Sequence, residues 1–157
     1  MSAVADYLRA VRRTHGGAPT EHSYRPDLQA LLEALRPGAV VTNEPRHSRR
    51  FGAVDMRVTT GAGPEALTIG YVECKDIGAA LDEIERSEQL KRYRDNLPSL
   101  VLTDYLEFRW YVEGAERDHA TLRVRRTYPA SLPPHRGGPC WCESGSVLLW
   151  LPVRDAV

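Results

Sequence analysis

Two carboxylates and one lysine are spaced so that they could act together on a metal ion and a phosphate. The stretch 70–78 reads GYVECKDIG and sets Glu73 and Lys75 two residues apart. Side chains two residues apart on a β-strand share a face, so both charges are expected on one side of a strand. Asp55 lies in the preceding strand-like segment. If the two strands form a hairpin, the Asp55 and Glu73 carboxylates approach each other and repel unless a cation lies between them.

These residue types suit the hydrolysis of a phosphodiester bond. Carboxylate oxygens are the ligands that Mg²⁺ prefers, and water and substrate phosphate can complete its octahedral shell. A lysine beside the ion can position or deprotonate the attacking water and can stabilise developing phosphate charge. Alternatively, Glu73 and Lys75 form an incidental ion pair on a solvated strand face. Taken alone, Glu-x-Lys favours this alternative, because the pattern is common and surface ion pairs contribute little to stability.

Hydrophobic periodicity indicates which elements position these groups. The expected elements, in chain order, are helices over 3–13 and 24–35, strands over 39–45, 51–60 and 67–75, a helix over 77–97, and strands over 99–103 and 108–112. The first three strands are expected to form a meander. In the strand over 51–60, Val54, Met56 and Val58 are expected on one face and Asp55 on the other. The order αβββαββ predicts an α/β (α+β) fold with a mixed central sheet flanked by helices.

The ordered motifs resemble a known family. Asp55 followed by Glu73-Cys74-Lys75 is similar to the signature of the PD-(D/E)XK nuclease superfamily, although Val54 stands where that signature has proline. The resemblance covers about residues 20–112. It is strongest to the N-terminal nuclease domains of restriction-modification enzymes that also carry an adenine methyltransferase. It implies a restriction-endonuclease-like core with an αβββαβ unit.

The resemblance also implies roles for individual residues. Asp55 and Glu73 would bind Mg²⁺ or Mn²⁺, and Lys75 would assist catalysis. Glu21 precedes the first core helix, where many members carry an acidic residue that reaches the metal. Its alternative is an acid in the first helical turn, which the helix dipole favours.

A second motif follows in the next helix. Gln89 and Tyr93 form the Gln-x-x-x-Tyr pattern of RecB-like nucleases. The two side chains lie one helical turn apart on one face. The resemblance implies that Gln89 belongs to the catalytic set, holding Lys75 or a phosphate, and that Tyr93 contacts the nucleic-acid backbone. A surface glutamine beside a core tyrosine is the alternative.

A basic cluster precedes Asp55. Arg46, Arg49 and Arg50 are expected to contact phosphates and so to position a duplex without reading its sequence. The alternative is a solvated loop. The formal net charge of the chain is zero, whereas a dedicated nucleic-acid binder often has a basic excess.

Length and composition fit one globular domain of 157 residues. Residues 1–114 are expected to form the nuclease-like domain, and residues 115–157 a loop-rich tail with one further strand or a truncation boundary. The three cysteines form no disulfide framework, which favours a reducing, cytoplasmic setting. The chain shows neither a signal peptide nor an apolar run long enough to span a membrane. His135, Cys140 and Cys142 lack the number and spacing of zinc ligands.

The expected function is that of a Mg²⁺-dependent endonuclease (a hydrolase) acting on DNA, as the cleavage module of a restriction or phage-defence system. One alternative is an inactive nuclease fold that binds DNA or docks a protein. Another is an unrelated α+β domain in which the motif occurs by chance. A homodimer and a larger methyltransferase-containing chain are both open. The sequence does not specify the recognition site, DNA or RNA, or the polarity of cutting.

Overall fold

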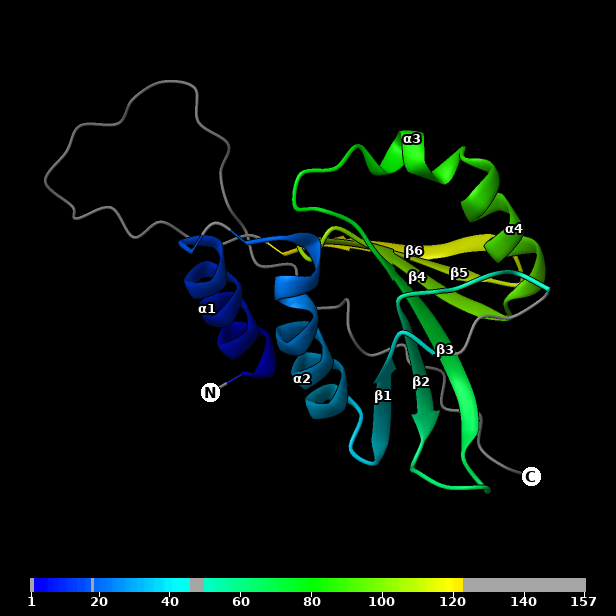
Figure 1. Cartoon of the computed structure of the whole chain (residues 1–157), viewed down its shortest axis with the longest axis horizontal. Coiled ribbons are helices and arrows are strands. Elements are labelled where there is room, and N and C mark those ends of the chain that lie inside the picture. The colour runs from blue at the N-terminus through cyan, green and yellow to red at the C-terminus, as the bar shows by residue number, and fades with distance from the viewer. Residues whose placement is uncertain (1, 18, 46–49, 123–157) are drawn as a thin grey trace, which may run out of the picture.

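The computed structural model describes residues 2–17, 19–45 and 50–122, with the side chain of Glu21 left out (Figure 1). Its elements are α1 (Ala3–His15), the 3₁₀ helix η1 (Glu21–Tyr24), α2 (Arg25–Leu35), β1 (Ala39–Asn43), β2 (Met56–Thr60), β3 (Leu67–Cys74), α3 (Leu81–Glu85), α4 (Glu88–Asn96), β4 (Ser99–Thr103), β5 (Glu107–Val112) and β6 (Ala115–Thr121).

The strands form one six-stranded sheet in the order β1-β2-β3-β4-β5-β6. Neighbouring strands are antiparallel except β3 and β4, which are parallel. The predicted mixed sheet flanked by helices is confirmed, and so is the meander of the first three strands. The β3–β4 connection runs through α3 and α4, as a parallel pair requires a crossover.

Two hydrophobic clusters pack against the sheet. The first joins α1 and α2 to the sheet through residues such as Leu28, Met56 and Val72. The second joins α3 and α4 to it through residues such as Leu90 and Leu100. Figure 1 shows the two helix pairs on separate sides of the sheet. Among the described residues, no helix combines the length and apolar character needed to cross a bilayer.

Three details differ from the sequence expectation. The helix expected over 77–97 is two helices, because the Ser87 side chain accepts a hydrogen bond from Leu90 N and caps a new helix start. Asp55 lies just before β2 and outside the regular strand. Val54 packs in the second cluster, whereas Met56 packs in the first, so the expected alternation of faces breaks at Asp55.

The sheet also continues beyond Gly114. A turn with positive φ at Glu113 (51°) and Gly114 (81°) leads into β6, which pairs with β5 along the edge. All of β6 except Ala120 is exposed, so it carries no apolar alternation that a sequence pattern would detect. The hairpin therefore crosses the boundary expected at residue 114. His135, Cys140, Cys142 and the strand-like stretch 146–153 lie outside the described residues.

Candidate active site

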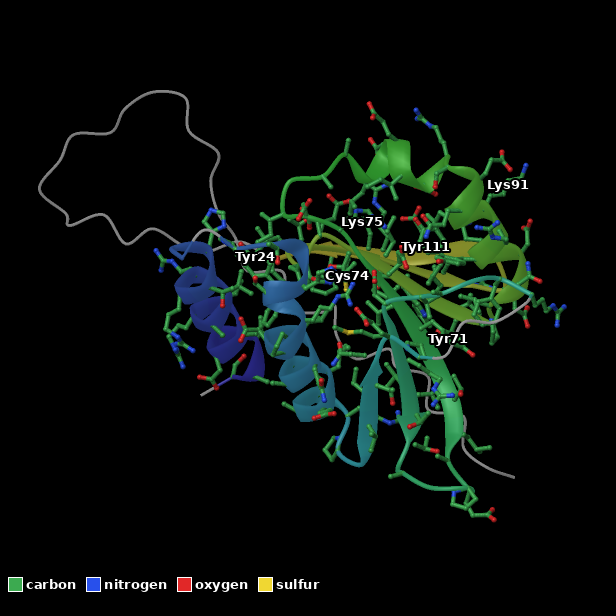
Figure 2. The ribbon with its side chains drawn as sticks, viewed as in Figure 1. Tyr24, Tyr71, Cys74, Lys75, Lys91 and Tyr111 are labelled. Atoms are coloured by element: carbon green, nitrogen blue, oxygen red, sulfur yellow. The ribbon has the colours of Figure 1, made fainter. Side chains whose placement is uncertain are left out.

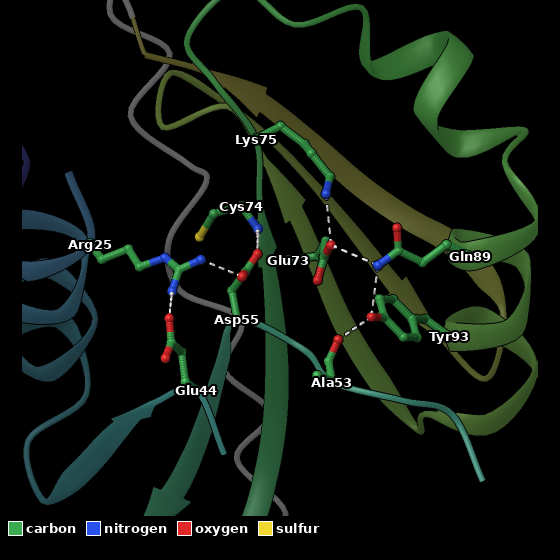
Figure 3. Close-up of polar contacts among 9 residues, drawn as sticks. All are labelled: Arg25, Glu44, Ala53, Asp55, Glu73, Cys74, Lys75, Gln89 and Tyr93. Carbon is green, nitrogen blue, oxygen red and sulfur yellow. Dashed lines mark hydrogen bonds and ion pairs between the residues drawn. The ribbon is translucent and has the colours of Figure 1, made fainter. Parts of the chain in front are cut away.

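The sheet topology brings Asp55 and Glu73 to the same end of the neighbouring strands β2 and β3. Because β2 and β3 are antiparallel, the start of β2 lies beside the end of β3. Asp55 immediately precedes β2, and Glu73 is the penultimate residue of β3. Asp55 Oδ2 accepts a hydrogen bond of 2.8 Å from the main-chain N–H of Cys74. The Asp55 carboxylate thus takes the place of a ladder carbonyl and lies against the main chain directly after Glu73 (Figure 3).

Glu73 is buried, with 4% of the residue exposed, and it contacts two donors. Lys75 Nζ lies 2.7 Å from Glu73 Oε1. Gln89 Nε2 donates to the same oxygen across 3.4 Å. The side chain of Lys75 is 24% exposed, so its ammonium lies between the buried carboxylate and the surface. A buried carboxylate with a cation and an amide donor is not the solvated ion pair of the alternative interpretation.

The helix α4 connects this site to the β1–β2 loop. Gln89 Nε2 donates to Tyr93 Oη across 2.9 Å, and the Tyr93 hydroxyl donates to the main-chain oxygen of Ala53. Tyr93 is 1% exposed. Burial raises the pKa of its hydroxyl, and the bond with Gln89 partly offsets that effect. Tyr93 therefore anchors the segment that carries Asp55, while its predicted contact with nucleic acid stays a prediction.

Arg25 is a site residue that the motif analysis missed. It begins α2 and is 6% exposed. One guanidinium nitrogen lies 2.5 Å from Asp55 Oδ1, and the other lies 2.9 Å from Glu44 Oε1. A signal existed in the sequence: Arg25 precedes Leu28 by three residues and Leu32 by seven, which places it on the buried face of the helix. An arginine on such a face needs a buried acceptor.

Several predicted residues are not placed at the site. The side chain of Glu21 and the residues Arg46 and Arg49 lie outside the described parts of the chain, so their roles stay predictions. Arg50 is exposed, and its Nε donates across 2.9 Å to Asn96 Oδ1 at the end of α4. This contact ties Arg50 to the end of α4.

The donor set at the edge suits a hard divalent cation. Asp55 and Glu73 offer carboxylate oxygens, and Mg²⁺ is commonly bound by one or two carboxylates with water and phosphate completing its shell. Within the described ranges, no group of three or more His, Cys, Asp or Glu side chains is placed to hold a metal ion. A metal at this edge would therefore rely on these two carboxylates, on water, and on Glu21 if that side chain reaches it.

Cys74 packs in the first hydrophobic cluster, on the side of the sheet that α1 and α2 cover. The residue is fully buried, and burial followed by the charge of Asp55 raises the pKa of its thiol to about 12. At neutral pH it is a protonated core side chain. It is neither a nucleophile nor a ready metal ligand, since both roles require the thiolate.

The fold of the chain is similar to that of a solved structure. A cryoEM structure of a DrdV–DNA complex matches with a TM-score of 0.61 and 21% sequence identity, covering 76% of this chain and 12% of that chain. At this identity the likeness concerns the fold alone. No protein-family model matches the chain, and no curated protein does.

Proposed function

We propose that this chain is a metal-dependent endonuclease domain of the PD-(D/E)XK superfamily, with a restriction-endonuclease-like core, that hydrolyses phosphodiester bonds of DNA. The observation that carries the proposal is the arrangement at the end of β3. Lys75 Nζ contacts the buried Glu73 carboxylate at 2.7 Å, and the Asp55 carboxylate binds the next main-chain N–H at 2.8 Å. The residues that resemble the nuclease motif thus lie close together at one end of strands β2 and β3, which supports the proposal.

Each residue has a distinct task in this proposal. Asp55 and Glu73 supply oxygen ligands for Mg²⁺ or Mn²⁺, and Glu21 is proposed as a further ligand. The bound ion would polarise the scissile phosphate and lower the pKa of a water molecule. Protonated Lys75 carries three N–H donors, which can orient that water, hold the phosphate oxygens and donate a proton. Gln89 orients Glu73 through its amide.

The use of lysine in this chain supports a chemical role for Lys75. The chain has 21 lysines and arginines, and only Lys75 and Lys91 are lysines. Lys75 is partly buried, with 24% of its side chain exposed, whereas Lys91 is exposed on α4 (Figure 2). Arginine cannot release a proton at physiological pH, whereas a lysine near a site can. A lysine at position 75, in a chain that otherwise favours arginine, fits a group that must exchange a proton.

DNA is the proposed partner. The matching DrdV chain was solved in a complex with DNA, and the present match spans only 12% of it. We propose that this domain is the cleavage module of a restriction or phage-defence system, alone or within a longer chain. Arg46, Arg49 and Arg50 are the proposed phosphate contacts. One site per chain would cut both strands most simply as a dimer.

A second candidate is a DNA-binding module without cleavage. One observation favours it: Asp55 already has a cation, because Arg25 lies 2.5 Å from its carboxylate. A site in which this ion pair never opens would bind DNA without loading a metal. Cleavage activity separates the two candidates.

The test is a nicking assay on supercoiled plasmid with Mg²⁺, with Mn²⁺ and with EDTA, paired with a gel shift in Ca²⁺. The near-isosteric variants Asp55→Asn and Glu73→Gln should lose cleavage and keep DNA binding. Asp118→Asn, on the exposed edge strand β6, is the matched control and should cut normally. If the unmodified chain shifts DNA but never nicks it, the binding module is correct. If both variants cut like Asp118→Asn, the proposed site is wrong.

A further inference from the structure

Both oxygens of the Asp55 carboxylate are engaged. Oδ1 lies 2.5 Å from an Arg25 nitrogen, and Oδ2 accepts the Cys74 N–H at 2.8 Å. In the view of Figure 3, the Asp55 carboxylate lies between the Arg25 guanidinium and the Glu73 carboxylate. An ion shared by the two carboxylates would therefore meet the positive charge of Arg25 at close range.

Arg25 is fixed in this position. Its side chain is 7% exposed, whereas that of Glu44, its second acceptor, is 73% exposed. Burial alone would lower the pKa of Arg25, but Asp55 first, and then other neighbours including Glu44, raise it above its ordinary value. The guanidinium therefore stays charged. Glu44 is itself held at the site, because its main-chain N–H donates to Asp55 O across 2.7 Å.

Resting on the proposed metal role of Asp55 and Glu73, we propose that Arg25 is an internal counter-cation that competes with the divalent ion for Asp55. Glu44 is the second acceptor, and it keeps the Arg25 guanidinium paired when the ion binds the Asp55 oxygen. The argument is electrostatic. Two cations on one carboxylate repel each other strongly in a partly buried site. The Arg25–Glu44 contact lets the guanidinium keep a partner while it moves away from Asp55.

The arrangement has a functional consequence. The metal-free site is stabilised because Asp55 is neutralised, and the affinity for free ion is lowered by the same contact. Phosphate oxygens of bound DNA add ligands to the ion and negative charge to the site, so DNA shifts the competition toward the ion. Arg25 thereby couples metal loading to the presence of substrate.

The experiment measures Mn²⁺ binding to the whole chain by the electron paramagnetic resonance signal of free Mn²⁺, without substrate and without turnover. Arg25→Met should bind Mn²⁺ about tenfold more tightly or better, since a nearby positive charge is removed. Glu44→Gln should bind it more weakly, because the guanidinium loses its ion pair with Glu44 and is then held more strongly by Asp55. Arg109→Met is the matched control, since Arg109 is also largely buried and ion-paired, but with Asp82, Glu85 and Glu107. Its affinity should equal that of the wild type.

The double variant Arg25→Met with Glu44→Gln distinguishes an effect of Glu44 that acts through Arg25 from a direct attraction between the Glu44 charge and the ion. If Glu44 acts through Arg25, the Glu44 change has no further effect once Arg25 is gone. Equal losses from Glu44→Gln in both backgrounds would overturn the proposal, and so would unchanged or weaker binding by Arg25→Met. If Arg25→Met does not fold, the exposed Glu44→Gln still decides: unchanged affinity overturns the proposal.

Failure of the proposed function would be distinguishable. Glu73→Gln is introduced into the wild type and into Arg25→Met. If neither protein then binds Mn²⁺ more weakly, the ion does not bind at Glu73, which overturns both proposals. Binding that depends on Glu73 but not on Arg25 would overturn only the counter-cation.

Discussion

Replacing Lys75 with arginine tests the proton transfer proposed for this residue. Lys75 Nζ lies 2.7 Å from Glu73 Oε1, and its side chain is 24% exposed, so space toward the surface is available for a longer head group. Arginine keeps the positive charge and the donors but holds its proton above pH 12. The chain uses arginine at 19 of its 21 basic positions. Lys75→Arg therefore changes titration more than it changes charge.

The expected magnitudes follow from what each variant retains. A charge pair near 4 Å in a partly buried site interacts by about 4 kcal/mol, before desolvation is subtracted. Arginine preserves most of this, so the unfolding free energy of Lys75→Arg should stay within about 1 kcal/mol of wild type. A positioned acid or base contributes about 10²- to 10⁴-fold to a rate. Lys75→Arg should thus cut at least about a hundredfold more slowly while remaining folded.

Lys75→Met is the companion variant. It removes the charge as well and takes the cation away from the buried Glu73 carboxylate, so it should lose stability together with activity. The control is Lys91→Arg, the same substitution at an exposed position of α4. Single-turnover plasmid nicking measures the rate, and urea denaturation measures stability. A Lys75→Arg protein that cuts within about threefold of wild type would refute the reasoning and reduce Lys75 to an electrostatic partner of Glu73.

Two further predictions concern stability. Tyr93→Phe should lower the unfolding free energy by about 1–3 kcal/mol, because Ala53 O and the Gln89 amide lose a buried partner. Urea denaturation checks this against Tyr71→Phe, whose residue is only half-buried; equal losses would contradict the anchoring role of the hydroxyl. The unfolding free energy should also fall as pH rises above about 9. Burial raises the pKa of the Cys74 thiol to about 12 in the folded chain, so the unfolded chain loses this proton at lower pH than the folded chain does. The loss from this group approaches about 1.4 kcal/mol per pH unit once the unfolded thiol is ionised, so Cys74→Ala should flatten the slope between pH 9 and 10, and an unchanged slope would contradict it.

Local periodicity predicted the parts of the site whose geometry is set by one element. Glu73 and Lys75 meet because strand side chains repeat every two residues, and Gln89 meets Tyr93 because helix side chains four apart are neighbours. The predicted meander also placed Asp55 beside Glu73, because antiparallel pairing brings the start of one strand to the end of its neighbour.

Tertiary contacts decided what the periodicity did not predict. The conformation of Asp55 is set by Arg25, 30 residues earlier, and by a main-chain N–H of β3. The local pattern places Arg25 on the buried face of α2, but it does not identify Asp55 as the partner of Arg25. The edge strand β6 is stabilised by its ladder with β5 and not by burial, so its polar sequence reads as a loop. Charges with distant partners and strands without a buried face are the features that sequence patterns miss.

The two cationic side chains of the site, Arg25 and Lys75, differ in burial and in proton affinity. Arg25 lies on the α2 side, largely buried, and bridges two carboxylates with a planar group that never releases its proton. Lys75 lies on the α4 side, nearer the surface, and its ammonium contacts the Glu73 carboxylate. The burial and the proton affinity of the two side chains therefore fit the proposed roles, in which the permanently charged guanidinium supports Asp55 and the partly exposed ammonium of Lys75 acts on the phosphate.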